Sequence, residues 1–91
     1  MEQRDFNRAI EVREALARRG QHRAVALPDL LIAAVAERAA LCVLHCDEDY
    51  DRIATVTNQS VQYEGTPYLP SRPYIWLDRA LGTYRLRILS K

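Results

Sequence analysis

The sequence contains few of the residues that mark special classes of protein. It has one lysine, three glycines and two cysteines, while 48% of its 91 residues are hydrophobic. Two cysteines are too few for a disulfide-stapled secreted domain, and the hydrophobic fraction excludes a disordered chain. No apolar run reaches the roughly 20 residues of a membrane-spanning helix, and the N-terminus is charged, unlike a secretion signal. We therefore expect one small globular domain in the cytoplasm, without a membrane partner.

The net charge of +1 conceals an uneven distribution of charged groups. Residues 41–64 carry five acidic groups and one basic group, whereas residues 65–91 carry five basic groups and one acidic group. An acidic patch by itself repels nucleic acid. It becomes useful for phosphate chemistry only when a metal ion neutralises it.

The two cysteines, Cys42 and Cys46, lie four residues apart in LCVLHC. On a strand they would be roughly 13 Å apart, too far for a disulfide bond. His45 between them raises the question of a metal site, but the number and spacing of ligands match no zinc pattern. Two small buried thiols in a reducing cytosol are the favoured interpretation.

Two helices are expected in the first 40 residues. Residues 5–19 form an amphipathic pattern that ends before Gly20, and residues 28–40 are apolar on nearly all sides, which indicates a buried helix. Pro28 suits the first position of a helix because its missing N–H has no partner there anyway. The apolar stripe of the first helix is predicted to contain Phe6, Ala9, Ile10, Leu16 and Ala17.

The next segment predicts two strands joined by a short helix. Leu41–His45 is a short apolar run, residues 50–57 favour a helix, and Val61–Tyr63 a second strand. This order predicts an α/β fold with two parallel strands against which helix 28–40 packs. We interpret residues 1–64 as the C-terminal half of a three-layer α/β fold with a parallel sheet.

The character of the sequence changes over residues 65–91. Prolines recur every three residues with tyrosines between them, which favours an extended linker. Residues 74–81 then predict a brief helix, and the alternation over 83–89 predicts a strand. The pattern gives no register between this atypical tail and the rest. Without the missing half of the fold, the apolar elements have too few partners, and we expect the isolated chain to be molten, aggregating or obligately associated.

Three aspartates are the candidate functional residues. Asp29 lies in PDLLIAA, at the start of the second helix, and Asp47 and Asp49 follow the first strand in HCDEDYDRIA. Ligands of open α/β sheets bind at the carboxyl ends of the strands, and clustered carboxylates suit hard divalent cations. We predict that the carboxylates of Asp29 and Asp47 converge within about 8 Å. Asp29 is otherwise explained as a helix-start acid, and Asp49 equally well as the cap of the next helix.

Residues 4–63 resemble the C-terminal half of PIN-domain ribonucleases, and among these the VapC toxins of bacterial type II toxin–antitoxin systems. The segments GQHR, PDLLIAA and DEDYDRIA carry the resemblance. It implies an endoribonuclease that depends on Mg²⁺ or Mn²⁺, acts on tRNA or rRNA and is held inactive by a VapB-like antitoxin. The resemblance also allows a homodimer.

The resemblance also implies roles for individual residues. Asp29 and Asp47 would be catalytic residues and metal ligands, Asp49 would be an accessory metal ligand, and Tyr50 stands where phenylalanine is usual. The family's first-strand aspartate and mid-domain glutamate have no counterpart, and Asp5 is no substitute because it lies at a helix start. Three hypotheses follow: a truncated toxin that is inactive alone, a non-catalytic fragment that binds a VapB-like antitoxin or an intact toxin, and a pseudogene product.

Overall fold

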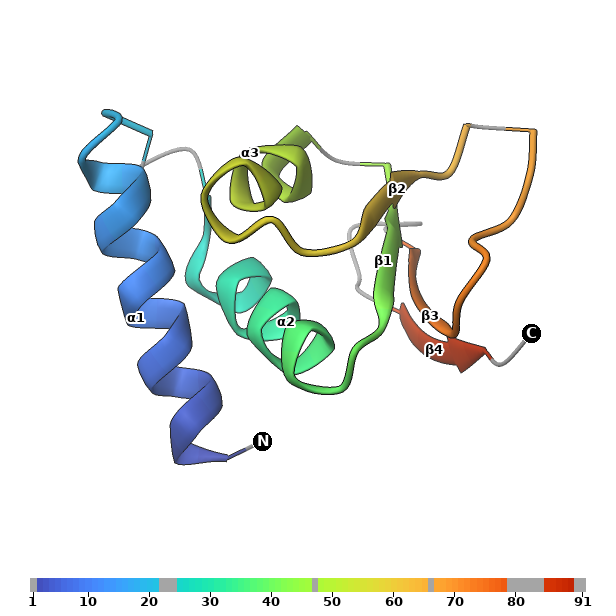
Figure 1. Ribbon diagram of the computed structural model, residues 1–91, viewed down its shortest axis with the longest axis horizontal. Helices are drawn as coiled ribbons and strands as arrows, with labels where there is room; N and C mark the ends of the chain where they lie inside the picture. The colour runs from blue at the N-terminus through green and yellow to red at the C-terminus, as the bar shows by residue number, and fades with distance from the viewer. Residues whose placement is uncertain (1, 22–24, 47, 66, 79–84, 90–91) are drawn as a thin grey trace.

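A computed structural model describes residues 2–21, 25–46, 48–65, 67–78 and 85–89, the last five and Asp78 by their backbone. The order of the first five elements, helix, helix, strand, short helix and strand, is as the sequence predicts (Figure 1). The elements are α1 (Gln3–Ala17), α2 (Leu27–Arg38), β1 (Cys42–His45), α3 (Glu48–Thr57), β2 (Val61–Tyr63), β3 (Tyr74–Asp78) and β4 (Arg85–Leu89).

The four strands form one sheet in the order β2-β1-β3-β4. β1 pairs in parallel with β2, placing Val43 opposite Val61, which confirms the predicted parallel pairing. β1 also pairs in parallel with β3 on its other side, placing Val43 opposite Ile75. β4 is antiparallel to β3 at the edge of the sheet. The fold is therefore α/β, as expected, and its parallel part has three strands.

The helices lie together on one side of the sheet, with α2 and α3 between α1 and the strands (Figure 1). Successive strand residues point to opposite faces, and the burial follows this rule. Val43, Ile75 and Leu77 join the helices in the main core. On the other face, Cys42, Leu44 and Tyr74 form a second cluster against which Trp76 packs.

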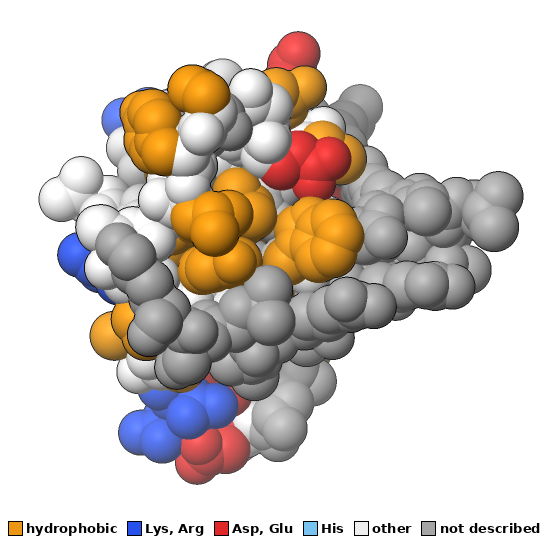
Figure 2. Space-filling model, turned by 90° about the vertical axis from the view of Figure 1, so that its right-hand side faces the viewer, with side chains coloured by type: hydrophobic (Ala, Val, Ile, Leu, Met, Phe, Trp, Pro, Cys, Tyr) orange, Lys and Arg blue, Asp and Glu red, His pale blue; other side chains and the backbone are white. Residues whose placement is uncertain are grey.

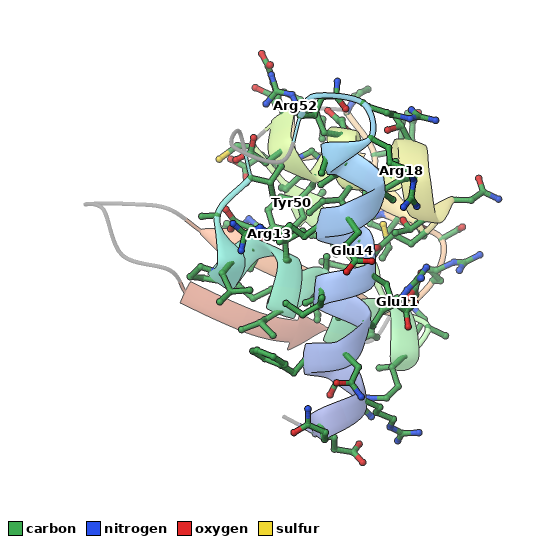
Figure 3. The ribbon with its side chains drawn as sticks, turned by 90° about the vertical axis from the view of Figure 1, so that its left-hand side faces the viewer. Glu11, Arg13, Glu14, Arg18, Tyr50 and Arg52 are labelled. Atoms are coloured by element: carbon green, nitrogen blue, oxygen red, sulfur yellow. The ribbon has the colours of Figure 1, made fainter. Side chains whose placement is uncertain are left out.

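The packing of α1 on α2 brings together residues about 30 positions apart. Small side chains allow close approach, since Ala9 and Ala36 are both fully buried. At the rim, the Arg8 guanidinium donates two hydrogen bonds to Glu37, at 2.7 and 3.1 Å. Figure 3 looks onto α1, where the labelled Glu11, Arg13, Glu14 and Arg18 lie along the helix, while Tyr50 and Arg52 belong to α3.

Three side chains of α1 differ from the sequence-based expectation, and one of them is Ala17, which was predicted in the apolar stripe and is exposed. Phe6 is 41% exposed, and Val12, which the predicted stripe omitted, is buried in its place. The helix ends at Ala17, and the expected stop is confirmed because Gly20 adopts a φ of 71°. This left-handed conformation lets the Gln21 N–H donate to the Leu16 carbonyl at 2.9 Å and so terminates the helix.

Asp5 has a structural role in the joint between α1 and α2. Its carboxylate accepts the Glu2 backbone N–H at 3.0 Å and two hydrogen bonds from the Arg38 guanidinium, at 2.7 and 3.0 Å. The Arg38 hydrogen bond, followed by the one from Glu2, lowers the pKa of Asp5 below its ordinary value of 3.8. The structure thus explains Asp5 as a buried capping residue of the helix.

The expected helix over residues 74–81 is wrong over its described part, where β3 is a strand from Tyr74 to Asp78. Short apolar runs fit a buried strand as well as a helix, and the free edge of β1 decides the outcome here. The Cys42 N–H donates to the Pro73 carbonyl at 3.0 Å, at the start of this pairing. The expected strand over residues 83–89 is confirmed over its described part as β4, Arg85–Leu89, and residues 83 and 84 lie outside the described residues.

Candidate functional site

The candidate site lies at the carboxyl end of β1, where α2 and α3 begin. The chain runs along α2, returns along β1 and continues into α3, which leads to the parallel strand β2. The first turns of α2 and α3 therefore lie at the carboxyl end of β1. Described residues that meet here are Asp29 in the first turn of α2, His45 at the end of β1, and Tyr50 in the first turns of α3.

Asp29 is the best-defined acid of this region. Its side chain is fully buried, and its Oδ1 accepts a hydrogen bond from the Tyr50 hydroxyl at 2.9 Å. A carboxylate removed from water costs much free energy unless hydrogen bonds or charges compensate for it. The Tyr50 hydroxyl supplies part of this compensation and fixes the orientation of the carboxylate.

Aromatic contacts extend this arrangement to the end of β1. The His45 ring lies 5.3 Å from the Tyr50 ring and 6.2 Å from the Tyr63 ring, measured between centroids. His45 is fully buried, and its Nε2 lies 3.3 Å from Oδ1 of Asp51, a side chain that is 58% exposed. The sequence pattern did not single out this contact, because it joins the end of a strand to an exposed side chain of the following helix.

The two aspartates after β1 are described to different extents. Asp47 lies outside the described residues, so the predicted convergence of the Asp29 and Asp47 carboxylates stays a prediction. The Asp49 side chain is 14% exposed, and its Oδ1 accepts a hydrogen bond from Arg52 Nη1 at 2.8 Å. Arg52 also pairs with Glu48 at 3.2 Å. The guanidinium therefore balances part of the acidic charge at the start of α3.

The described residues alone do not make up a divalent-metal centre. Among them, no group of three or more His, Cys, Asp or Glu side chains is placed to hold an ion. One Asp29 oxygen faces the Tyr50 hydroxyl and one Asp49 oxygen faces a guanidinium. Hard divalent cations such as Mg²⁺ take about six oxygen ligands. Asp29 and Asp49 alone would leave most of these coordination positions to other groups.

Both cysteines are free thiols, and Cys42 is buried as expected. The expectation that Cys46 is also buried is wrong, because Cys46 is exposed. None of the described helices combines the length and apolar content that crossing a membrane requires.

One acid at this edge escaped the sequence analysis. The backbone of Asp78 ends β3, which runs parallel to β1, so Asp78 reaches the same edge of the sheet as His45. The available signal was an apolar run that ends in aspartate, YIWLD. The run was interpreted as a helix, and its strand-end position was therefore missed.

About 60 residues of this chain are similar to known proteins. Ribonuclease VapC21 of Mycobacterium tuberculosis is 50% identical to this chain over 60 residues, which are 66% of this chain and 44% of the relative. Ribonuclease VapC2 of the same species is 54% identical over 56 residues, or 62% of this chain and 40% of the relative. Ribonuclease VapC18 is 43% identical over 60 residues, or 64% and 44%.

This chain is related to the VapC ribonucleases. The resemblance read from the sequence motifs is thereby confirmed. The chain spans less than half the length of the VapC relatives it matches. No family model matches the sequence.

Proposed function

We propose that the chain carries part of a VapC-like, Mg²⁺- or Mn²⁺-dependent endoribonuclease toxin of a type II toxin–antitoxin system, acting in the cytoplasm. The observation that supports this proposal most is the identity of 50% over 60 residues to a VapC ribonuclease. The partners proposed with it are a VapB-like antitoxin, a tRNA or rRNA substrate and, for the longer toxin of which the chain carries part, a second copy in a homodimer.

The proposal assigns Asp29 and Asp47 as catalytic residues and metal ligands, and Asp49 as a further ligand. The buried position of Asp29 beside the end of β1 supports its assignment. Carboxylate oxygens are the ligands that Mg²⁺ and Mn²⁺ prefer.

We propose further that these 91 residues cleave RNA weakly or not at all. Asp29 and Asp49 each accept a hydrogen bond from a neighbouring side chain, which competes with an ion for the same oxygens. The counterparts of the first-strand aspartate and mid-domain glutamate are absent from the 91 residues. An ion held by so few protein oxygens is weakly bound.

The test combines an activity with a binding measurement. The chain and its Asp29→Asn variant are incubated with labelled tRNA and rRNA fragments in excess Mn²⁺, and Mn²⁺ binding is measured by electron paramagnetic resonance. We expect little cleavage and weak Mn²⁺ binding that Asp29→Asn weakens further. Strong cleavage that Asp29→Asn abolishes would contradict the proposed inactivity. Mn²⁺ binding that is unchanged in the Asp29→Asn, Asp47→Asn and Asp49→Asn variants would contradict the site assignment.

A non-catalytic fragment that binds a VapB-like antitoxin or an intact toxin is the second candidate. The engagement of Asp29 by Tyr50 and of Asp49 by Arg52 favours it, because both acids already serve as structural groups. Co-expression with a VapB-like antitoxin followed by analytical size exclusion separates the alternatives. A stable complex formed equally by Asp29→Asn supports a binding role, and the absence of any complex or cleavage would favour a pseudogene product.

A further inference from the structure

The side chains of Asp29 and Tyr50 are closed off from solvent together. Asp29 has 0% and Tyr50 1% of its surface exposed, and the Tyr50 hydroxyl donates to Asp29 Oδ1 at 2.9 Å. Bulk water therefore does not reach the carboxylate. Mg²⁺ loses its waters reluctantly and usually keeps several of them when a protein carboxylate binds it. A hydrated ion reaches Asp29 only after the side chains around the carboxylate have moved.

The ring of Tyr50 is held in its position by packing. It belongs to the main hydrophobic core, to which α1, α2 and β1 also contribute side chains. It also lies against the buried His45 ring, whose centroid is 5.3 Å away at an interplanar angle of 35°. A side chain in a close-packed core does not change position without opening a void or displacing its neighbours. The core therefore keeps the Tyr50 hydroxyl on the carboxylate.

A hydrogen bond of this kind can act on a bound ion in two opposite ways. A hydroxyl that stays on the carboxylate when the ion binds orients the ligand and strengthens ion binding. A hydroxyl that has to leave stabilises only the ion-free state, and it therefore weakens ion binding. The complete burial of Asp29 and Tyr50 favours the second way, because an ion and its waters need space beside the carboxylate.

We infer that Tyr50 keeps Asp29 closed to divalent cations, so that the Tyr50 hydroxyl group sets how tightly the chain binds them. The inference rests on the proposed role of Asp29 as a metal ligand. Tyr50 acts through Asp29, by controlling whether its carboxylate is available. Weak ion binding by the chain then has a second cause besides the small number of acids.

The test removes the hydroxyl group and keeps the aromatic ring. Mn²⁺ binding by the unchanged chain and by Tyr50→Phe is measured by electron paramagnetic resonance in the absence of RNA. We expect Tyr50→Phe to bind Mn²⁺ at least roughly tenfold more tightly, which corresponds to the loss of one hydrogen bond to a charged group. Asp29→Asn added to Tyr50→Phe should abolish this gain.

The matched control is Tyr74→Phe, which removes a hydroxyl group on the other side of the sheet. Tyr74 is also buried, at 7% exposed, but it belongs to the cluster on the sheet face that the helices do not cover. Figure 2 views the molecule from this side and shows hydrophobic side chains gathered in the middle of the face. Tyr74→Phe should leave Mn²⁺ binding unchanged. The unfolding midpoint of each variant shows whether its fold is intact.

A second measurement needs no variant at position 50. The buried Tyr50 hydroxyl proton exchanges slowly with water and can be followed by nuclear magnetic resonance while Mg²⁺ is added. We expect its resonance to disappear as Mg²⁺ binds, because the hydroxyl leaves the carboxylate. This measurement tests the inference even if Tyr50→Phe does not fold.

The outcomes separate this inference from the proposed function. Asp29-dependent Mn²⁺ binding that is equal or weaker in folded Tyr50→Phe would overturn the inference and leave the site assignment standing. A Tyr50 hydroxyl resonance that persists at saturating Mg²⁺ would overturn it in the same way. Mn²⁺ binding that Asp29→Asn leaves unchanged in both backgrounds would overturn the site assignment, and the inference with it.

Discussion

The buried side chains of β3 offer the sharpest test of the fold, because they decide whether the tail belongs to the core. Ile75 is 1% exposed and packs in the main core with α1, α2 and β1. Replacing it with alanine removes buried methyl groups and leaves a cavity, which costs about 2–5 kcal/mol in well-packed cores. The free energy of unfolding of a domain of this size is roughly 5–14 kcal/mol, so Ile75→Ala should remove a large part of it.

The measurement is urea unfolding followed by circular dichroism at several protein concentrations. With a urea dependence of about 1.5 kcal/mol per M, Ile75→Ala should lower the midpoint by roughly 1–3 M. Leu69→Ala is the matched control, since Leu69 belongs to the same tail but is 64% exposed. It should change the free energy of unfolding by less than about 0.5 kcal/mol.

The result also decides between two expectations for the isolated chain. The sequence pattern showed no partner for the tail and therefore predicted a molten or associated species. The pairing of β3 with β1 supplies the missing partner, and we now expect a cooperative transition that does not depend on concentration. Equal midpoints for Ile75→Ala and Leu69→Ala, or a transition that moves with protein concentration, would refute this reasoning.

Further predictions concern the side-chain contacts. Tyr50→Phe should lower the free energy of unfolding by about 1.5–3 kcal/mol, since it removes a hydrogen bond to the buried Asp29 carboxylate. A double-mutant cycle with Asp29→Asn should show coupling, and strictly additive effects would speak against the contact. Asp5→Asn should destabilise the fold at neutral pH, because the lowered pKa of Asp5 means that its ionised form stabilises the native state. This difference should disappear as the pH falls through the native pKa of Asp5, and a difference that persists in acid would contradict the Arg38 pairing.

Local patterns in the sequence were sufficient to predict those helices and strands whose signal lies within the segment itself. The apolar run after Pro28 predicted α2, and the parallel pairing of β1 with β2 followed from a strand, a short helix and a strand in close succession. The alternation of residues in the tail predicted β4. These predictions succeed because side-chain periodicity and short connections are local properties.

For the candidate site, the motifs identified Asp29 and the relation to VapC ribonucleases. Tyr50 was visible as a departure from the usual phenylalanine, but the acceptor of its hydroxyl was not. That acceptor, Asp29, lies 21 residues earlier and meets Tyr50 only because α2 and α3 begin at the same edge of the sheet. Contacts of this kind depend on the packing of elements and leave no periodic signal.

Only the tertiary structure determined that the segment YIWLD forms a strand and not a helix. A short apolar run fits a helix or a buried strand, and only the free edge of β1, about 30 residues earlier, makes the strand favourable. From that pairing follow the burial of Ile75 and the position of Asp78. The sequence alone determined which segments have a regular local structure and to which family they are related. The choice among their non-local pairings required the folded chain, because hydrogen bonds between distant strands form only after the chain has brought them together.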